Sequence, residues 1–468
     1  MIIYRRSLAI LLSIVLAVAA AQAGVAAQES KPTIRHHRVA EEVHDDSSSP
    51  EVDQAETAMQ RGDFAAAEAL LQKAVAAKPD DYRAWFDLGY IYARTQRPPL
   101  AIDAYKKSIA AKPDVFESNL DLGLLLAHWP REGESAEEAA KYLRAATQLK
   151  PTAHPQESLM NAWLALGRVL EPKEPTQALL AYAEASKVNP KDPEPHVFAG
   201  LFYETHVCRI CIDSTTESRL NSAATEYKAA LAVDPTSRDA LLGLDRIYES
   251  QKNYAEAEIW LRKLVALDPN HSARLYLAQV LSAEGKDDEA AEQLKASLQD
   301  NPADRYASLA LGKLYLKAGK DAEAEPQLRL AVKELPQDAE AHYALGSLLM
   351  HEKKYPEAQQ ELLVAVKLKP DLADAYGNLA VVASENKNYE LALKSLDYRA
   401  RFLPESPASY FLRATCFDHL KAVKQAVEYY QHFLAADAGK LPDQEWQARH
   451  RLIALDPQHA EKYEIKKK

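Results

Sequence analysis

The chain has 468 residues, of which 47% are hydrophobic and 27% charged, and its formal net charge at pH 7 is −11. A length of this order suggests about three ordinary domains. The acidic balance argues against nonspecific binding to nucleic acid or anionic lipid, which attract basic surfaces.

The amino terminus has the layout of an export signal. Arg5 and Arg6 precede an apolar run over residues 8–18, and a stretch of small residues follows. A positive n-region, an apolar h-region and an A-x-A site are typical of a secretory signal peptide. We predict cleavage after Ala23, with a second candidate site after Ala27, and an exported, periplasmic protein. The alternative is a retained signal anchor, although the run is short for a span of about 20 residues.

The segment after the signal, residues 24–47, is polar and lacks hydrophobic periodicity, which predicts a flexible linker. His36, His37 and His44 lie in this segment. We interpret them as solvated linker residues rather than metal ligands, and we predict neither a metal site nor a cofactor.

Ten prolines recur at a nearly constant interval along the rest of the chain. They are Pro79, Pro113, Pro151, Pro190, Pro235, Pro269, Pro302, Pro336, Pro370 and Pro404. The gaps that end at Pro151, Pro190 and Pro235 are longer than the others. The others lie close to the period of roughly 34 residues that is typical of a helical repeat array. In such an array each unit buries its apolar face only against its neighbours.

The residue pattern between two successive prolines of this series predicts two short helices. The first carries a stripe at i, i+3, i+4 and i+7, formed in the second unit by Trp85, Leu88, Gly89 and Tyr92. The second helix contains the small residue Ala101 and stops before Pro113. Helices this short are marginal alone, so we expect stacking to stabilise them.

One position of the first helix, which we call the glycine slot, is glycine in many of the units. Six of the 14 glycines occupy it: Gly89, Gly123, Gly167, Gly200, Gly312 and Gly346. Glycine within a helix costs about 1 kcal/mol relative to alanine. We therefore expect close packing of the paired helices to require glycine there.

This pattern resembles the tetratricopeptide repeat family, whose W-x2-L-G-x2-Y signature is intact at residues 85–92. The resemblance covers residues 48–440. It implies an all-α fold, a right-handed α-solenoid of about eleven helix-turn-helix units. Residues 441–468 are then expected to form a capping helix with a short basic tail, because a solenoid end needs a polar outer face.

Several units depart from the pattern: the first lacks the Trp and Tyr residues, and the eleventh has no closing proline. Insertions near residues 127–135, 152–159 and 204–219 lengthen three of the units. The sixth unit has Asp245 in the slot that holds a small residue elsewhere.

The insertion at 204–219 contains a C-x-x-C pair, Cys208 and Cys211. In an oxidising compartment we predict a local disulfide between them. The alternatives are a redox-active thiol pair and a metal site, for which the nearby sequence lacks two further ligands. Cys416 is interpreted as a small core residue.

The sequence contains no G-x-S-x-G, P-loop, H-E-x-x-H or G-x-G-x-x-G motif, and we predict that the protein is not an enzyme. The resemblance instead implies binding in a concave groove lined by the first helices. The groove is expected to present the residue after the Trp slot and the residue four positions later. The partner-binding residues predicted from these slots are Phe86, Tyr90, Leu120, Leu124, Arg168, Arg246, Gln279 and Lys313. The alternative is that some of the apolar members pack between adjacent units.

The predicted function is an exported, non-catalytic scaffold or adaptor that binds a protein or peptide. Such a groove suits a peptide with apolar anchors and an acidic stretch. One alternative is an accessory subunit of a membrane enzyme or of an envelope or secretion complex. A second is a thiol-redox protein that uses the C-x-x-C pair. No nucleic-acid partner is expected, and membrane contact only through an uncleaved signal.

Overall fold

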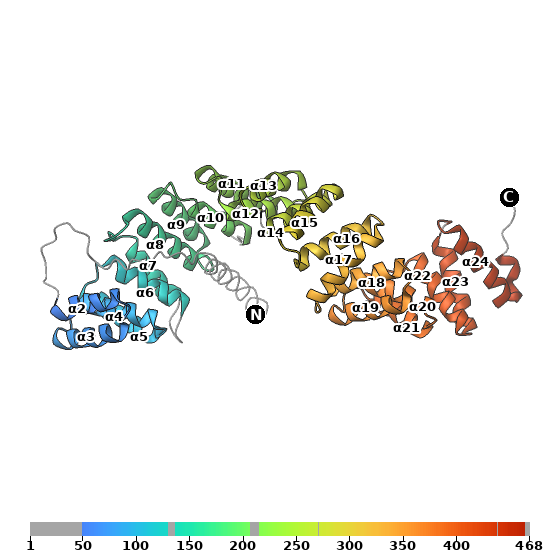
Figure 1. Ribbon diagram of the computed structural model, residues 1–468, viewed down its shortest axis with the longest axis horizontal. Helices are drawn as coiled ribbons and strands as arrows, with labels where there is room; N and C mark the ends of the chain where they lie inside the picture. Colours follow the sequence, from blue (N-terminus) through green and yellow to red (C-terminus); the bar gives the residue numbers. More distant parts are fainter. Residues whose placement is uncertain (1–48, 130–135, 206–214, 270, 438, 464–468) are drawn as a thin grey trace. The chain divides into compact units, whose positions relative to one another are not determined.

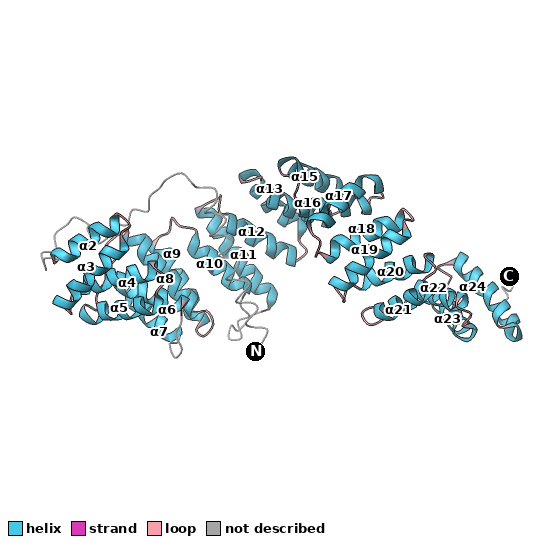
Figure 2. Ribbon diagram, turned by 60° about the horizontal axis from the view of Figure 1, so that its bottom comes forward, coloured by secondary structure: helices cyan, strands magenta, loops and turns pink. Residues whose placement is uncertain are grey.

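The computed structural model describes residues 49–129, 136–205, 215–269, 271–437 and 439–463. Within these ranges every regular element is a helix and there is no strand (Figures 1 and 2). The chain divides into two compact units, Met1–Pro235 and Thr236–Lys468.

The described part of the first unit contains ten helices. They are α2 (Pro50–Gln60), α3 (Phe64–Ala77), α4 (Tyr82–Arg94), α5 (Pro98–Ala111), α6 (Phe116–His128), α7 (Ala136–Ala146), α8 (Pro155–Leu170), α9 (Pro175–Val188), α10 (Glu194–Thr205) and α11 (Thr216–Val233).

The described part of the second unit contains thirteen α-helices and a final 3-10 helix. They are α12 (Arg238–Ser250), α13 (Tyr254–Leu267), α14 (His271–Ala283), α15 (Asp287–Asp300), α16 (Arg305–Lys317), α17 (Asp321–Glu334), α18 (Ala339–His351), α19 (Tyr355–Leu368), α20 (Ala373–Glu385), α21 (Tyr389–Arg399), α22 (Pro407–His419), α23 (Val423–Asp437), α24 (Pro442–Leu455) and η1 (Pro457–Lys462).

Consecutive helices pack as hairpins, from α2–α3 to α22–α23, which gives eleven hairpins in the described residues. Within each unit, the second helix of a hairpin also packs against the first helix of the next (Figure 1). The all-α solenoid of about eleven units is therefore confirmed. After the last hairpin, α24 packs on α23, in the segment where we predicted a capping helix.

The two helices of a hairpin approach each other closely at the glycine slot. A Cβ atom placed on Gly167 would lie 2.4 Å from Tyr182 Cε1, and one on Gly89 would lie 2.6 Å from Tyr105 Cε1. Carbon atoms in contact are normally about 3.5–4.0 Å apart. The expectation that close helix packing requires glycine at this slot is confirmed.

The Trp slot has a structural role that several residue types fulfil. The indole Nε1 of Trp85 donates a hydrogen bond to the carbonyl of Pro79, at 2.8 Å. Asn119 Nδ2 donates to the carbonyl of Pro113 at 2.9 Å, and Nε2 of His342 lies 3.3 Å from the equivalent proline carbonyl. The carbonyl beyond a helix end has no partner within that helix. In these three hairpins the slot supplies a side-chain nitrogen that can satisfy the proline carbonyl.

The turn inside many hairpins places one residue in the left-handed conformation. Glycine fills this position in some hairpins, and a residue with a Cβ atom fills it in others: Gln96, Lys252, Lys353, Lys387 and Lys421, with φ between 57° and 64°. A Cβ atom disfavours this conformation by roughly 1–2 kcal/mol.

Replacing Lys387 with glycine is therefore expected to stabilise the second unit by about 0.5 kcal/mol. Glycine removes the steric cost of the left-handed conformation. This gain exceeds the free-energy cost of the additional backbone entropy that glycine loses on folding, roughly 0.5–1 kcal/mol. Urea denaturation followed by circular dichroism measures the change. The control is Lys394→Gly, in the interior of α21, which is expected to destabilise by about 1 kcal/mol. A loss of stability in Lys387→Gly would contradict the prediction.

Candidate interaction surface

The first helix α14 buries one face and leaves the opposite face open. On α14 the buried residues are Ala273, Leu277, Ala278, Val280 and Leu281. The opposite stripe, at spacing i, i+3, i+4 and i+7, starts at Ser272 and contains no buried residue. Such a stripe is the amphipathic pattern of a helix with one side packed and the other free to make contacts.

The residues predicted to bind partners differ in how much surface they offer. Leu124 is 44% exposed, and Arg168, Arg246, Gln279 and Lys313 are also exposed. Tyr90 and Leu120 are partly buried. Phe86 is only 7% exposed, and its ring lies 5.7 Å from the ring of Tyr105. Phe86 therefore packs mainly in the hairpin core.

The structure brings some of these residues onto neighbouring helices. In the first unit, α6 carries Leu124 and contacts α8, which carries Arg168. In the second unit, α14 carries Gln279 and contacts α16, which carries Lys313. In both places two consecutive first helices contact each other, so the predicted residues that they carry lie on adjoining helices.

The first unit also carries a series of carboxylates on these helices that the sequence analysis missed. Asp53, Asp87 and Asp121 lie one on each of α2, α4 and α6, one repeat period apart. Burial raises the pKa of Asp87 well above its ordinary value, and the nearby charge of Glu56 raises it further. Burial raises the pKa of Asp121 to about 7, against the opposing effect of the hydrogen bond from the Tyr105 hydroxyl. The regular spacing of the three aspartates was the signal available in the sequence.

Two first helices of the second unit each carry an exposed aromatic residue that the sequence analysis also missed. Tyr276 on α14 is 41% exposed, and Tyr306 on α16 is 47% exposed. Leu275 and Leu309 occupy the slot after the Trp slot, which we predicted to face the groove. Tyr276 comes one residue after Leu275, and Tyr306 comes three residues before Leu309. No residue pattern distinguished them from core tyrosines.

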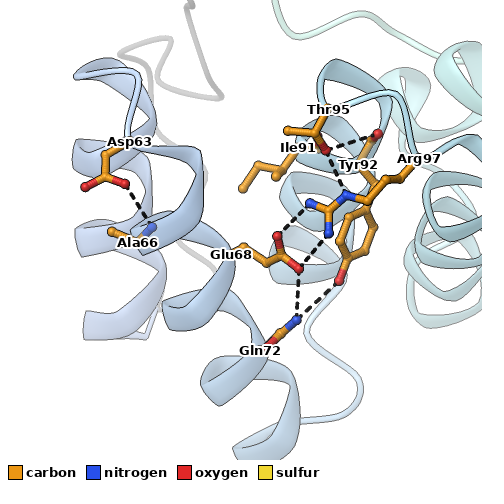
Figure 3. Close-up of polar contacts among 8 residues, drawn as sticks. All are labelled: Asp63, Ala66, Glu68, Gln72, Ile91, Tyr92, Thr95 and Arg97. Carbon is orange, nitrogen blue, oxygen red and sulfur yellow. Dashed lines mark hydrogen bonds and ion pairs between the residues drawn. The ribbon is translucent and has the colours of Figure 1, made fainter.

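Charges along the second helices are paired across adjacent hairpins instead. The guanidinium of Arg97 donates hydrogen bonds of 3.1 and 2.6 Å to the two carboxylate oxygens of Glu68, and it lies over the ring of Tyr92 (Figure 3). Gln72 donates to the same carboxylate at 3.1 Å. This contact ties the first described hairpin to the second.

The same link recurs at the corresponding positions of later hairpins. Lys286 donates to Glu258 at 2.6 Å, and Lys354 lies 3.4 Å from Glu325. Hydrogen bonds, first from Lys286 and then from Arg262, lower the pKa of Glu258 to about 2. Paired charges on this side contrast with the open stripes of the first helices.

Several other kinds of site find no support in the described residues. These residues contain no group of three or more His, Cys, Asp or Glu side chains arranged to hold a metal ion. Their helices include none with the length and apolar character needed to cross a membrane. The predicted disulfide of Cys208 and Cys211 and the three linker histidines lie outside the described residues.

Comparison with known proteins identifies the repeat. A family model for the tetratricopeptide repeat matches residues 52–116, 275–339, 309–373 and 378–440, and a second model for the same repeat matches residues 215–281. No curated protein matches the sequence.

Three solved structures are among those that match the chain. YrrB, a TPR protein with an unusual peptide-binding site, is 23% identical, with 42% of this chain and 95% of YrrB covered and a TM-score of 0.34. PilF of Pseudomonas aeruginosa is 22% identical, with coverages of 45% and 96% and a TM-score of 0.41. Yeast Tom70 is 13% identical, with coverages of 87% and 95% and a TM-score of 0.33.

The matched repeats together span more than half of the chain, and the structure contains the helix hairpins that this repeat forms. The chain belongs to the tetratricopeptide repeat family, whose fold is typically a non-catalytic scaffold for protein interactions.

Proposed function

We propose that this chain is an exported, non-catalytic scaffold that binds protein or peptide partners in a concave groove lined by the first helices. One observation carries the proposal. The residue next to the buried small-residue slot is exposed in six of the described hairpins: Leu124, Arg168, Arg246, Gln279, Lys313 and Val381. These side chains contribute little to the packing of their own hairpins, whereas the adjacent slot is fully enclosed.

The chemistry of these positions supports an extended or helical peptide as the ligand. In the first unit, Leu124 offers an exposed apolar side chain and Tyr90 a partly buried aromatic one. Apolar anchors flanked by charged groups are the usual means by which a groove binds a peptide. The binding face and the paired charges of the second helices then have separate roles, recognition and stacking.

The export part of the proposal rests on the amino-terminal sequence alone. The charged, apolar and small-residue segments in that order support secretion with cleavage after Ala23. Cell fractionation with amino-terminal sequencing of the mature protein tests it. A mature chain that begins at Gly24 is expected in the periplasmic fraction. Recovery of the chain in the cytoplasm with its first residues intact would contradict the export proposal.

Replacing Tyr90 and Leu124 together with alanine is expected to lower partner capture at least tenfold. Aromatic and buried apolar anchors contribute about 2 kcal/mol or more each at an interface. The measurement is quantitative mass spectrometry of partners recovered from an envelope extract on the full chain.

The matched control replaces Leu100 and Leu180 with alanine. Both are as exposed as Leu124, but they lie on the second helices α5 and α9. This control is expected to recover partners as the unaltered chain does. Equal recovery by both variants would rule out the groove of the first unit as the binding site.

A further inference from the structure

One surface of the second unit combines exposed aromatic rings with exposed cations. It consists of the outward stripes of α14 and α16, which contact each other. We call it the tyrosine face, and it comprises Ser272, Leu275, Tyr276, Gln279, Tyr306, Leu309, Ala310 and Lys313, with the exposed Arg305 beside Tyr306 at its edge. No member is buried. On the next first helix, α18, two residues of the equivalent stripe, Ala344 and Ser347, are buried.

The two tyrosines give this face its apolar character. Tyr276 and Tyr306 expose 41% and 47% of their surface, and the partly exposed Leu275 and Leu309 lie on the same stripes. Tyrosine offers a large apolar ring and a polar hydroxyl, and it loses little side-chain entropy on binding. Exposed tyrosines on adjoining helices are therefore suited to hold an apolar side chain of a ligand.

The charges at this face are positive and only loosely paired. The guanidinium of Arg305 lies over the ring of Tyr306, 5.0 Å from its centroid. The half-exposed Lys313 reaches Glu340 only at 3.5 Å. The nearest acidic residue in sequence, Asp304, is buried, and its carboxylate accepts hydrogen bonds from the backbone N–H groups of Tyr306 and Ala307. Asp304 is thus committed to the helix start, and the two cations remain accessible.

We infer that the tyrosine face binds an acidic peptide segment that also carries apolar side chains. Carboxylates of the peptide pair with Arg305 and Lys313, and an apolar side chain packs against Tyr276 and Tyr306. Guanidinium and ammonium groups form their strongest hydrogen bonds with carboxylates. The inference rests on the proposed function and specifies where in the second unit a ligand lies and what its charge is.

The test is a selection of random dodecapeptides displayed on phage against the immobilised full chain. Enriched peptides are expected to be acidic and to contain Leu, Ile, Val or Phe. Selected peptides are then synthesised with a fluorescent label, and their affinities are measured by fluorescence anisotropy. Affinity is expected to fall at least tenfold for Tyr276→Ala with Tyr306→Ala.

The matched control replaces Leu363 and Trp446, exposed apolar residues on α19 and α24, with alanine. It is expected to bind the peptides as the unaltered chain does. A charge-swapped variant, Arg305→Glu with Lys313→Glu, is expected to lose the acidic peptides. It should bind the same peptides with lysine in place of each acidic residue, a reversal that loss of folding cannot produce.

The outcomes separate the inference from the proposed function. Peptides that are basic, or whose binding the tyrosine variant leaves unchanged, overturn the inference while groove binding stands. The absence of any enriched peptide also overturns it, and the envelope capture with Tyr90 and Leu124 variants then decides the proposed function. Two further results would overturn the inference if they replaced peptide binding and depended on the two tyrosines. One is self-association of the chain, measured by light scattering. The other is binding of the chain to phosphatidylglycerol vesicles.

Discussion

Replacing Gly346 with alanine is expected to destabilise the second unit by about 2 kcal/mol, because overpacking of a core typically costs about 1–3 kcal/mol. This loss is expected although alanine is the better helix former. A Cβ atom on this residue of α18 would lie 2.7 Å from Cγ of Leu362 and 3.3 Å from its backbone nitrogen. Leu362 is fully buried, and because the nitrogen belongs to α19 a side-chain rotation alone cannot make room.

The same substitution at Gly377 is expected to have the opposite sign. This glycine lies in α20, and its nearest neighbours are side-chain atoms of Arg399 at 3.5 Å, an ordinary contact distance. Alanine there should stabilise the helix by up to about 1 kcal/mol.

Urea denaturation of the full chain, with hydrogen exchange of peptides from α18–α19 and α20–α21, measures both changes. Local exchange is needed because a solenoid can open hairpin by hairpin. The Gly346 variant should exchange faster in α18–α19, and the Gly377 variant slower in α20–α21. Changes of the same sign in the two variants would contradict the steric argument.

The sequence sufficed for the architecture because steric requirements fix residue type at a few slots. Only glycine fits beside Leu362 or Tyr182, so the glycine slot recurs visibly along the chain. A proline that follows a helix is likewise a local signal. Such constraints act within a hairpin and do not depend on distant parts of the chain.

The Trp slot shows where residue identity is a poor guide. Asn119 and His342 depart from the family signature, yet each places a nitrogen by the carbonyl of the preceding proline, as Trp85 does. These three hairpins share a side-chain nitrogen at the same position of the first helix. Three different residue types supply it, and therefore the shared role was not visible in the sequence.

The candidate surface was the least predictable feature, because the packing of neighbouring hairpins decides which part of a stripe remains exposed. Phe86 and Leu275 occupy equivalent slots, but Phe86 is buried and Leu275 is not. The raised pKa of Asp87 has a partly similar origin, since burial raises it most and the charge of Glu56, on the helix α2 of the preceding hairpin, raises it further. Both properties depend on which side chains pack around the residue in three dimensions, about which a repeat pattern carries little information.

Asp245 is the position where local pattern and packing conflict most strongly. It occupies the small-residue slot of α12 and is 3% exposed. Its Oδ1 atom has no hydrogen-bond partner among the described residues. Leu261 of α13 has the same spacing from Asp245 as Leu362 has from Gly346, and it is fully buried. A carboxylate in these surroundings is poorly solvated.

Burial raises the pKa of Asp245 to about 7, and the charge of Glu249 adds to the effect, while Arg246 opposes it. The unfolded chain releases this proton near pH 4, whereas the folded chain holds it until about pH 7. Stability contributed by the protonated group is therefore complete below pH 4. This stability is lost progressively as the pH rises from 4 to about 7. Above pH 7 the cost of burying the charged carboxylate no longer changes with pH.

Replacing Asp245 with alanine is expected to stabilise the second unit by about 2 kcal/mol at pH 8. The full pKa difference corresponds to about 4 kcal/mol, and about half remains after allowance for the residual hydration of the carboxylate and for the neighbouring Arg246. The gain should shrink as the pH falls from 7 to 4, because protonation already removes the penalty in the unaltered chain.

Hydrogen exchange of peptides from α12–α13, measured from pH 5 to 8 and corrected for the intrinsic pH dependence of exchange, tests this expectation. Asp245→Asn separates charge from size, and it should give most of the same gain at pH 8. Asp239→Ala, an exposed aspartate on the same helix, is the control and should shift stability by less than about 0.5 kcal/mol at any pH. A pH-independent gain in Asp245→Ala would show that the side-chain volume of Asp245, rather than its charge, weakens this hairpin.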